Sequence, residues 1–198
     1  MKPKLAPDRQ KLYHIAEPQA GYFTTQQARQ AGFAQPLLSY YAKTGYLTRI
    51  ARGVFRLTQF PEMPFGDLFV AWLQAGHDAV VSHESALAVY ELSDVLPGEI
   101  HLSVPRTASR RRRGIRWHTC RLTAREITRR TGLPVTTITR TLADLVVSGL
   151  GEEQIQQAIH EALARGLVTG KTLASFAARR KGRVAQVIQN ALATEPRA

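Results

Sequence analysis

The local signals in residues 21–57 restrict most strongly what this chain can fold into. Thr24 is a favourable helix N-cap, and Gln27 stands three residues later, as in a capping box. Gly32 is suited to the left-handed position that ends a helix, and Pro36 is tolerated in the first turn of a second one. These signals predict two short helices joined by a tight turn.

A β-ribbon is predicted directly after the second helix, which we expect to end at Gly45. Residues 46–50 and 54–57 are rich in β-prone side chains, and a turn at residues 51–53 joins them. The order of helix, turn, helix and two-stranded ribbon predicts a winged helix-turn-helix. A helical hairpin with a ribbon that makes only protein contacts is the alternative.

The second helix of this motif has an apolar side and a polar side. Its apolar stripe is predicted to be Leu38, Tyr41 and Ala42, so polar side chains face outward, where such a helix enters the major groove of DNA. We expect Gln35 and Ser39 to contact base edges, and Tyr40 and Lys43 to reach phosphate or sugar. Arg49, Arg52 and Arg56 are predicted to lie on the wing, where they would contact the neighbouring DNA backbone or minor groove.

The beginning of this helix is a candidate anion site. Gln35 is a poor N-cap, so the first backbone N–H groups are expected to stay available to a phosphate.

The charge of the chain is strongly positive and unevenly distributed. The formal net charge is +12 with a pI of about 10.5. It is +7 over residues 1–60, −7 over residues 61–100 and +9 over residues 101–134. A basic field attracts polyanions through counterion release, and its segregation into blocks favours a nucleic-acid partner.

An arginine-rich segment contributes most of the second basic block. It holds Arg106 and Arg116 at its ends, with Arg110, Arg111, Arg112 and Arg113 between them. This segment is predicted to clamp DNA phosphate or enter a minor groove. Docking on an acidic protein surface and a solvated loop remain alternatives.

The rest of the chain predicts an α+β domain. A proline- and glycine-containing stretch after the wing suggests a boundary, giving a winged helix-turn-helix domain at 1–60 and an α+β domain at 61–198. The predicted strands are 79–81, 100–104, 115–120, 127–130 and 135–137, and the predicted helices are 65–74, 82–92, 138–148, 152–165, 171–180 and 183–192.

Residues that carry catalysis are scarce. Ser82, His83 and Glu84 are sequence neighbours and cannot converge as a hydrolase triad, so we expect Ser82 to cap a helix and His83 to lie in its first turn. Cys120 is the single cysteine and is predicted to be a small core residue. The basic residues 101–134 contain one acid, Glu126, which argues against a metal-dependent nuclease.

The histidines are the remaining candidate metal ligands. His77, His83, His101 and His118 do not stand at any recognised ligand spacing. We therefore expect no metal, no cofactor and no enzymatic activity. The sequence has neither a membrane span nor an apolar signal segment, which indicates a soluble protein of the cytoplasm.

Three segments resemble the AbiEi family of bacterial antitoxins and transcriptional regulators. They are YFTTQQARQAGF with LLSYYAKTGYLTRIARGVFRL, then AVVSHESALAVYELSDVLPGEIHLSVP, and then LPVTTITRTLADLV. The resemblance runs from about residue 8 to residue 180. It implies a DNA-binding domain and a C-terminal antitoxin domain, with operator contacts at Gln35, Ser39, Tyr40, Lys43 and Arg52. It assigns no catalytic residue.

The implied function is that of an autorepressor and antitoxin in an abortive-infection system. It would bind inverted repeats in its own promoter, as a monomer or a weak dimer that cooperates on DNA, and counter a nucleotidyltransferase-type toxin. The alternative is a DNA-targeting accessory protein with a degenerate nuclease-like C-terminal domain. A toxin gene directly downstream would distinguish the two.

Overall fold

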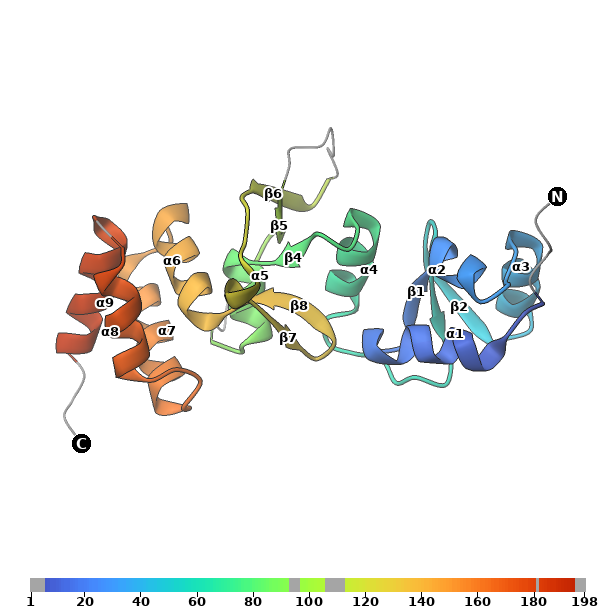
Figure 1. Cartoon of the computed structure of the whole chain (residues 1–198), viewed down its shortest axis with the longest axis horizontal. Helices are drawn as coiled ribbons and strands as arrows, with labels where there is room; N and C mark the ends of the chain where they lie inside the picture. Colours follow the sequence, from blue (N-terminus) through green and yellow to red (C-terminus); the bar gives the residue numbers. More distant parts are fainter. Residues whose placement is uncertain (1–5, 93–96, 106–112, 181, 195–198) are drawn as a thin grey trace. The chain divides into compact units, whose positions relative to one another are not determined.

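The computed structural model describes residues 6–92, 97–105, 113–180 and 182–194 (Figure 1). The chain forms two compact units. The N-terminal unit comprises residues 1–79 with residues 131–133, and the C-terminal unit comprises residues 80–130 with residues 134–198. Within the described ranges, the helices are all too short or too polar to cross a membrane.

The N-terminal unit contains the predicted winged helix-turn-helix. Its elements are α1 (Arg9–Ala16), the 3-10 turn η1 (Glu17–Gln19), β1 (Tyr22–Thr24), α2 (Thr25–Gln30), α3 (Gln35–Lys43), β2 (Leu47–Ala51), β3 (Val54–Leu57) and α4 (Gly66–Ala75). The capping box is confirmed: the Gln27 N–H donates to Thr24 Oγ1 at 3.1 Å, and the Thr24 N–H donates to Gln27 Oε1 at 2.8 Å.

A three-stranded antiparallel sheet supports the helices. The strand order is β1-β3-β2, so the predicted ribbon gains a third strand that the sequence did not reveal. Helix α1 was also not predicted. Both additions bury apolar side chains in one core, which includes Leu12, Phe23, Phe33, Leu38, Leu47, Phe55 and Leu57.

Helix α4 packs with the winged helix, although the sequence-based division at 60/61 placed it in the second domain. The rings of Tyr22 and Phe69 stack with a centroid separation of 5.1 Å and an interplanar angle of 2°. A Cβ at Gly66 would lie 2.7 Å from the Tyr22 hydroxyl oxygen, which shows how closely the start of α4 approaches β1. Turn residues mark where chain direction changes, whereas tertiary packing decides to which unit a helix belongs.

The C-terminal unit combines a mixed sheet with helices. Its elements are β4 (Val80–Val81), α5 (His83–Val89), β5 (Ile100–Val104), β6 (Ile115–Thr119), η2 (Ala124–Glu126), β7 (Ile127–Arg130), β8 (Leu133–Thr136), α6 (Ile138–Ser148), α7 (Glu152–Ala164), α8 (Gly170–Ala178) and α9 (Arg183–Ala193). The strand order is β6-β5-β4-β8-β7, with β4 antiparallel to β5 and parallel to β8, and with β5 parallel to β6.

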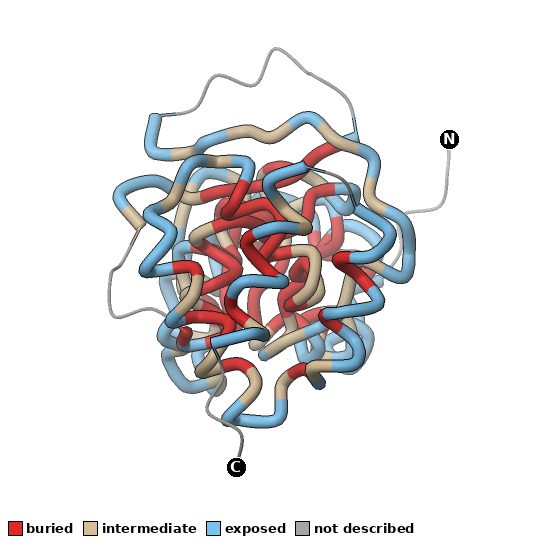
Figure 2. The backbone as a smooth tube through the Cα atoms, turned by 90° about the vertical axis from the view of Figure 1, so that its left-hand side faces the viewer, coloured by how far each residue is buried: buried red, intermediate tan, exposed pale blue. Residues whose placement is uncertain are grey.

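The helices of this unit continue from the sheet. Helix α5 contacts β5 and α6, and α6, α7, α8 and α9 pack on one another (Figure 1). Figure 2 shows the buried stretches of the backbone in red and the exposed ones in pale blue. The predicted α+β class is confirmed. Helix α5 ends at Val89, before the predicted end at Leu92, and Glu91 takes a left-handed φ of 56°.

Candidate nucleic-acid interface

Helix α3 presents the polar face that the sequence predicted. Leu38 is fully buried beneath it, whereas Gln35, Ser39, Tyr40 and Lys43 are all exposed. Tyr40 is 58% exposed, which is unusual for an aromatic side chain in a small unit with a packed core. The four polar side chains are therefore accessible to a partner.

The beginning of α3 has no side-chain cap. The N-cap residue is Ala34, one residue before the predicted position, and no side chain accepts a hydrogen bond there. Pro36 lies in the first turn and has no N–H to satisfy. The positive end of the helix dipole is therefore not neutralised by a capping side chain, but the Leu37 N–H donates to the Ala34 carbonyl at 3.0 Å, so fewer backbone N–H groups stay available than the sequence predicted.

Tyrosine rings from α3 and the start of the wing pack together at the C-terminal end of α3. Arg9 of α1 donates from Nη2 to Tyr41 Oη at 3.0 Å and lies over the rings of Tyr41 and Tyr46. Tyr40 packs edge-on against Tyr41, with ring centroids 5.4 Å apart. Arg9 thus supports the helix through Tyr41, a role that the sequence analysis missed because α1 was not predicted.

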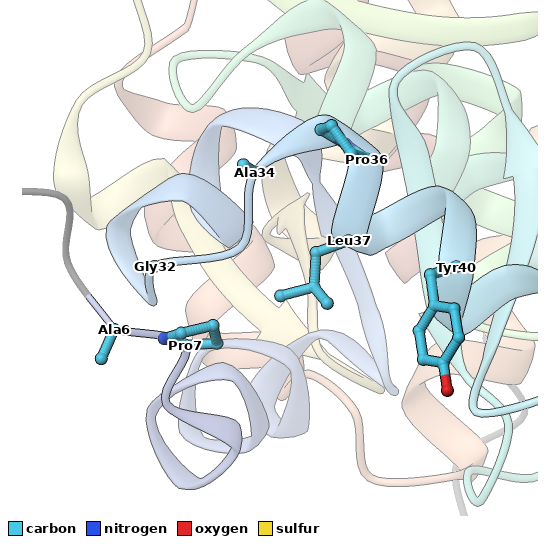
Figure 3. A pocket seen from close by; sticks show the side chains of 7 residues that line it. All are labelled: Ala6, Pro7, Gly32, Ala34, Pro36, Leu37 and Tyr40. Carbon is cyan, nitrogen blue, oxygen red and sulfur yellow. The ribbon is translucent and has the colours of Figure 1, made fainter.

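An apolar depression of about 570 Å³ adjoins α3 (Figure 3). It is lined by Ala6 and Pro7 before α1, by Gly32 and Ala34 between α2 and α3, and by Pro36, Leu37 and Tyr40 of α3. Leu37 points toward the segment at Pro7 that precedes α1, and the Tyr40 hydroxyl points away from the helix (Figure 3). The candidate interface therefore combines polar side chains with apolar surface.

The wing is short and anchored at its turn. The backbone N–H of Thr25 donates to the carbonyl of Gly53 at 2.9 Å, and Gln74 of α4 donates from Nε2 to the carbonyl of Arg52 at 3.2 Å. Gly53 has a φ of 76°, which favours glycine at this turn. Arg49 and Arg52 are exposed, as predicted.

Arg56 is not exposed on the wing, contrary to the prediction that grouped it with Arg49 and Arg52. It is 7% exposed, and its guanidinium donates to the Pro61 carbonyl and to Glu62 Oε1, both at 3.3 Å. It also lies over the ring of Tyr22. On β3, the middle strand of the sheet, this side chain packs inside the unit, so it is not presented to DNA.

The arginine-rich segment is described only at its end. Arg110, Arg111 and Arg112 lie outside the described residues, whereas Arg113 is described and is exposed.

The structure also places Ser82 and the histidines that the sequence singled out. Ser82 occupies the N-cap position of α5, but its side chain makes no capping bond; instead it lies 3.0 Å from His83 Nδ1. This corrects its predicted role. The structure also brings together His83, His101 and His118, which sequence spacing did not connect, whereas His77 is exposed and outside that group.

Residues 10–58 match the family model described as transcriptional regulator, AbiEi antitoxin, which confirms the resemblance over this segment and supports a DNA-binding antitoxin role. No curated protein matches the chain. The crystal structure of the RV2827C protein from Mycobacterium tuberculosis is similar in fold, with 17% identity and a TM-score of 0.53, over 98% of this chain and 81% of that chain.

Proposed function

We propose that this chain, whose residues 10–58 match the AbiEi antitoxin regulators, is an autorepressor and antitoxin of a bacterial toxin–antitoxin system. It binds inverted repeats in its own promoter and counters a nucleotidyltransferase-type toxin. The observation that carries the proposal is the exposed polar face of α3 within a winged helix. Regulators of this family are generally non-enzymatic, and the proposed function needs no catalysis.

Recognition of the operator follows from the side chains of α3 and the wing. With α3 in the major groove, Gln35 and Ser39 contact base edges, and Tyr40 and Lys43 contact the sugar-phosphate backbone. Arg49 and Arg52 reach phosphates beside the groove. At the uncapped start of α3, Pro36 has no N–H and the Leu37 N–H donates to the Ala34 carbonyl, so the Gln35 N–H is the donor proposed for one more phosphate.

The inverted repeat and the toxin complete the proposal. Two monomers that cooperate on DNA, or one weak dimer, place one winged helix on each half-site, and the spacing of the half-sites is set by the helical repeat of DNA. The C-terminal unit carries the antitoxin function in the cytoplasm. In this proposal the N-terminal unit carries operator binding and the C-terminal unit carries neutralisation, with the division near residue 79 and not at 60/61.

The operator contacts are tested by the double variant Ser39→Ala/Tyr40→Ala. Loss of the Ser39 base contact should cost about 1–3 kcal/mol of preference for the native promoter, and loss of the Tyr40 backbone contact should weaken binding to every sequence, so weak, salt-sensitive binding should remain. Footprinting on the promoter measures this. The matched control is Gln154→Ala/Gln157→Ala on the exposed side of α7, which should bind as the wild type does. Operator preference retained by the α3 variant would contradict the assignment of this helix.

The antitoxin half is tested separately. When expressed from an unrelated promoter, the Ser39→Ala/Tyr40→Ala variant should still rescue cells that express the cognate toxin, and it should fail to repress the native promoter in a reporter strain. Loss of rescue together with loss of repression would show that protection depends on DNA binding.

A further inference from the structure

Three histidines from separate elements of the C-terminal unit meet at one place. His83 is the first residue of α5, His101 lies in β5 and His118 lies in β6. In the parallel pair of strands, His118 is opposite Ser103, so His101 is its diagonal neighbour on the same face of the sheet. The Ser82 N–H donates to the His101 carbonyl at 3.1 Å, which brings the start of α5 to the same face.

The ligand atoms of these side chains are close enough to share one metal ion. One nitrogen from each ring lies within 4.8 Å of the other two. His118 Nε2 and His101 Nδ1 are 3.3 Å apart. Two nitrogens bound to tetrahedral zinc at about 2.0–2.1 Å are separated by roughly 3.3–3.4 Å, so this pair already has the required spacing.

The third histidine is held by serine hydroxyls. Ser82 Oγ is 3.0 Å from His83 Nδ1, and Ser103 donates to Ser82 Oγ at 2.8 Å. In the tautomer that donates from Nδ1 of His83 to Ser82 Oγ, the lone pair on Nε2 is left for a metal. Histidine ligands in metal sites usually donate their second ring nitrogen to such a partner, which fixes the tautomer and the ring orientation.

The backbone at His83 has an unusual conformation for a residue that is not glycine. Its φ is 52°, in the left-handed region that non-glycine residues rarely adopt. The ring stacks on that of His118, with centroids 3.5 Å apart and planes 15° apart, so the in-plane lone pairs of these two rings are nearly parallel and one ring must turn about its side-chain torsions to share an ion with the other. The fold thus places this ring beside the other two in spite of backbone strain.

The environment keeps the imidazoles neutral, which is the form that binds a metal. Burial, with smaller effects from His118, His101, Arg140 and Arg116, lowers the pKa of His83 to about 3. Burial also lowers the pKa of His118 to about 4 and that of His101, for which Arg116 acts in the same direction and Glu84 and Glu99 oppose it.

We propose that His83 Nε2, His101 Nδ1 and His118 Nε2 bind one divalent zinc ion and leave its fourth position to water or to an exogenous ligand. Three neutral imidazoles without a carboxylate or thiolate suit Zn²⁺ and do not suit Mg²⁺ or Ca²⁺. The bound ion links the start of α5 to the edge pair β5–β6. It is independent of operator binding by the N-terminal unit.

The test uses the full-length protein after treatment with a chelator. Zn²⁺ is titrated at neutral pH in competition with a chromophoric chelator, and Co²⁺ is titrated as a spectroscopic probe. The expected results are one Zn²⁺ per chain and the intense visible bands of tetrahedral Co²⁺. Weak bands of octahedral Co²⁺, or the absence of stoichiometric zinc binding, would mean that the three rings form only a stacked and hydrogen-bonded cluster.

Two variants assign the ligands. His118→Gln replaces the half-buried ligand, and His83→Asn replaces the ligand with a residue that tolerates the left-handed conformation. Each should weaken zinc binding by about 100-fold or more. Loss of a residue that only hydrogen-bonds a metal ligand lowers affinity by about 10–100-fold, and loss of the ligand itself should cost at least as much. His77→Gln, an exposed histidine outside the cluster, should bind zinc as the wild type does.

Circular dichroism of the metal-free variants checks that they are folded. A folded His118→Gln protein with wild-type affinity would overturn the proposal. If neither variant folds, the stoichiometry and the Co²⁺ spectrum of the wild type decide it.

Discussion

Arg140 Nη1 lies 2.8 Å from Glu126 Oε1, so the arginine of the T-x-x-R-T-L-A-D-L segment ties α6 to the turn that precedes β7. The same guanidinium donates from Nε to Asp144 Oδ1 at 2.8 Å, one turn along α6. Arg180 adds a longer ion pair to Glu126 at 3.4 Å. This sequence motif of the C-terminal unit is thus explained by packing and charge pairing inside the unit.

The first prediction concerns this network. Glu126→Gln should lower the free energy of unfolding by about 1–3 kcal/mol, because a partly buried arginine loses one of its two carboxylate partners. Urea denaturation measures the change. The control is Glu152→Gln at the exposed start of α7, which should stay within about 0.5 kcal/mol of the wild type. Equal stability of the two variants would contradict a structural role for the ion pair.

The second prediction is that stability depends on pH through the same ion pair between Glu126 and Arg140. Burial raises the pKa of Glu126, but hydrogen bonds from the Thr123 backbone and Arg140 outweigh it and lower the pKa to about 2 from an ordinary 4.5. A lowered carboxyl pKa contributes stability above pH 4.5, and that contribution disappears as the pH falls toward 2.

The contribution of Glu126 to the pH dependence of stability can be isolated by comparing the wild type with a variant. Burial raises the pKa of Asp144, which opposes the effect of Glu126 in the wild type. The difference in unfolding free energy between the wild type and Glu126→Gln should therefore shrink between pH 5 and pH 2. A difference that is constant with pH would show that Glu126 titrates normally in the folded protein.

The third prediction concerns the capping box of α2. Thr24→Ala removes the acceptor of the Gln27 N–H and should lower the unfolding free energy by about 1 kcal/mol. Thermal unfolding followed by circular dichroism measures it. Ser39→Ala, which removes an exposed hydroxyl from the neighbouring helix, serves as the control and should change stability by less than about 0.5 kcal/mol.

The fourth prediction separates two arginines that the sequence grouped together. Arg52→Gln at the exposed wing turn should reduce the slope of log binding constant against log salt by about 0.9, with unchanged stability, if Arg52 contacts a phosphate. Arg56→Met should leave the slope unchanged and lower stability, because its guanidinium is paired inside the unit. The opposite pattern would return Arg56 to the DNA-contacting surface.

The fifth prediction concerns α4. A fragment of residues 1–79 should unfold cooperatively and at higher temperature than a fragment of residues 1–60, because the shorter one leaves Tyr22 without Phe69 and exposes the surface that α4 covers. Melting curves of the two fragments at equal concentration test this. Identical curves would show that α4 adds nothing to the winged helix.

Much of the local structure was predictable from the sequence. The capping box at Thr24, the uncapped start of α3, the wing and the helices from Ile138 onward all appear where neighbouring residues indicated them. Caps, turn glycines and hydrophobic periodicity act within a few residues, so they can be recognised without knowing the fold. The exposed side chains of α3 followed from the same periodicity.

Tertiary structure alone decided which distant residues meet. Local signals place Arg52 in a turn and Arg56 on a strand, but they do not show that β1 pairs with β3 and makes it the middle strand, on which Arg56 is buried. The three histidines lie far apart in the sequence and converge because β5 and β6 pair in parallel and β4 delivers the start of α5 beside them. Strand order and register set such contacts, and they depend on burial of the whole core, to which residues throughout the chain contribute.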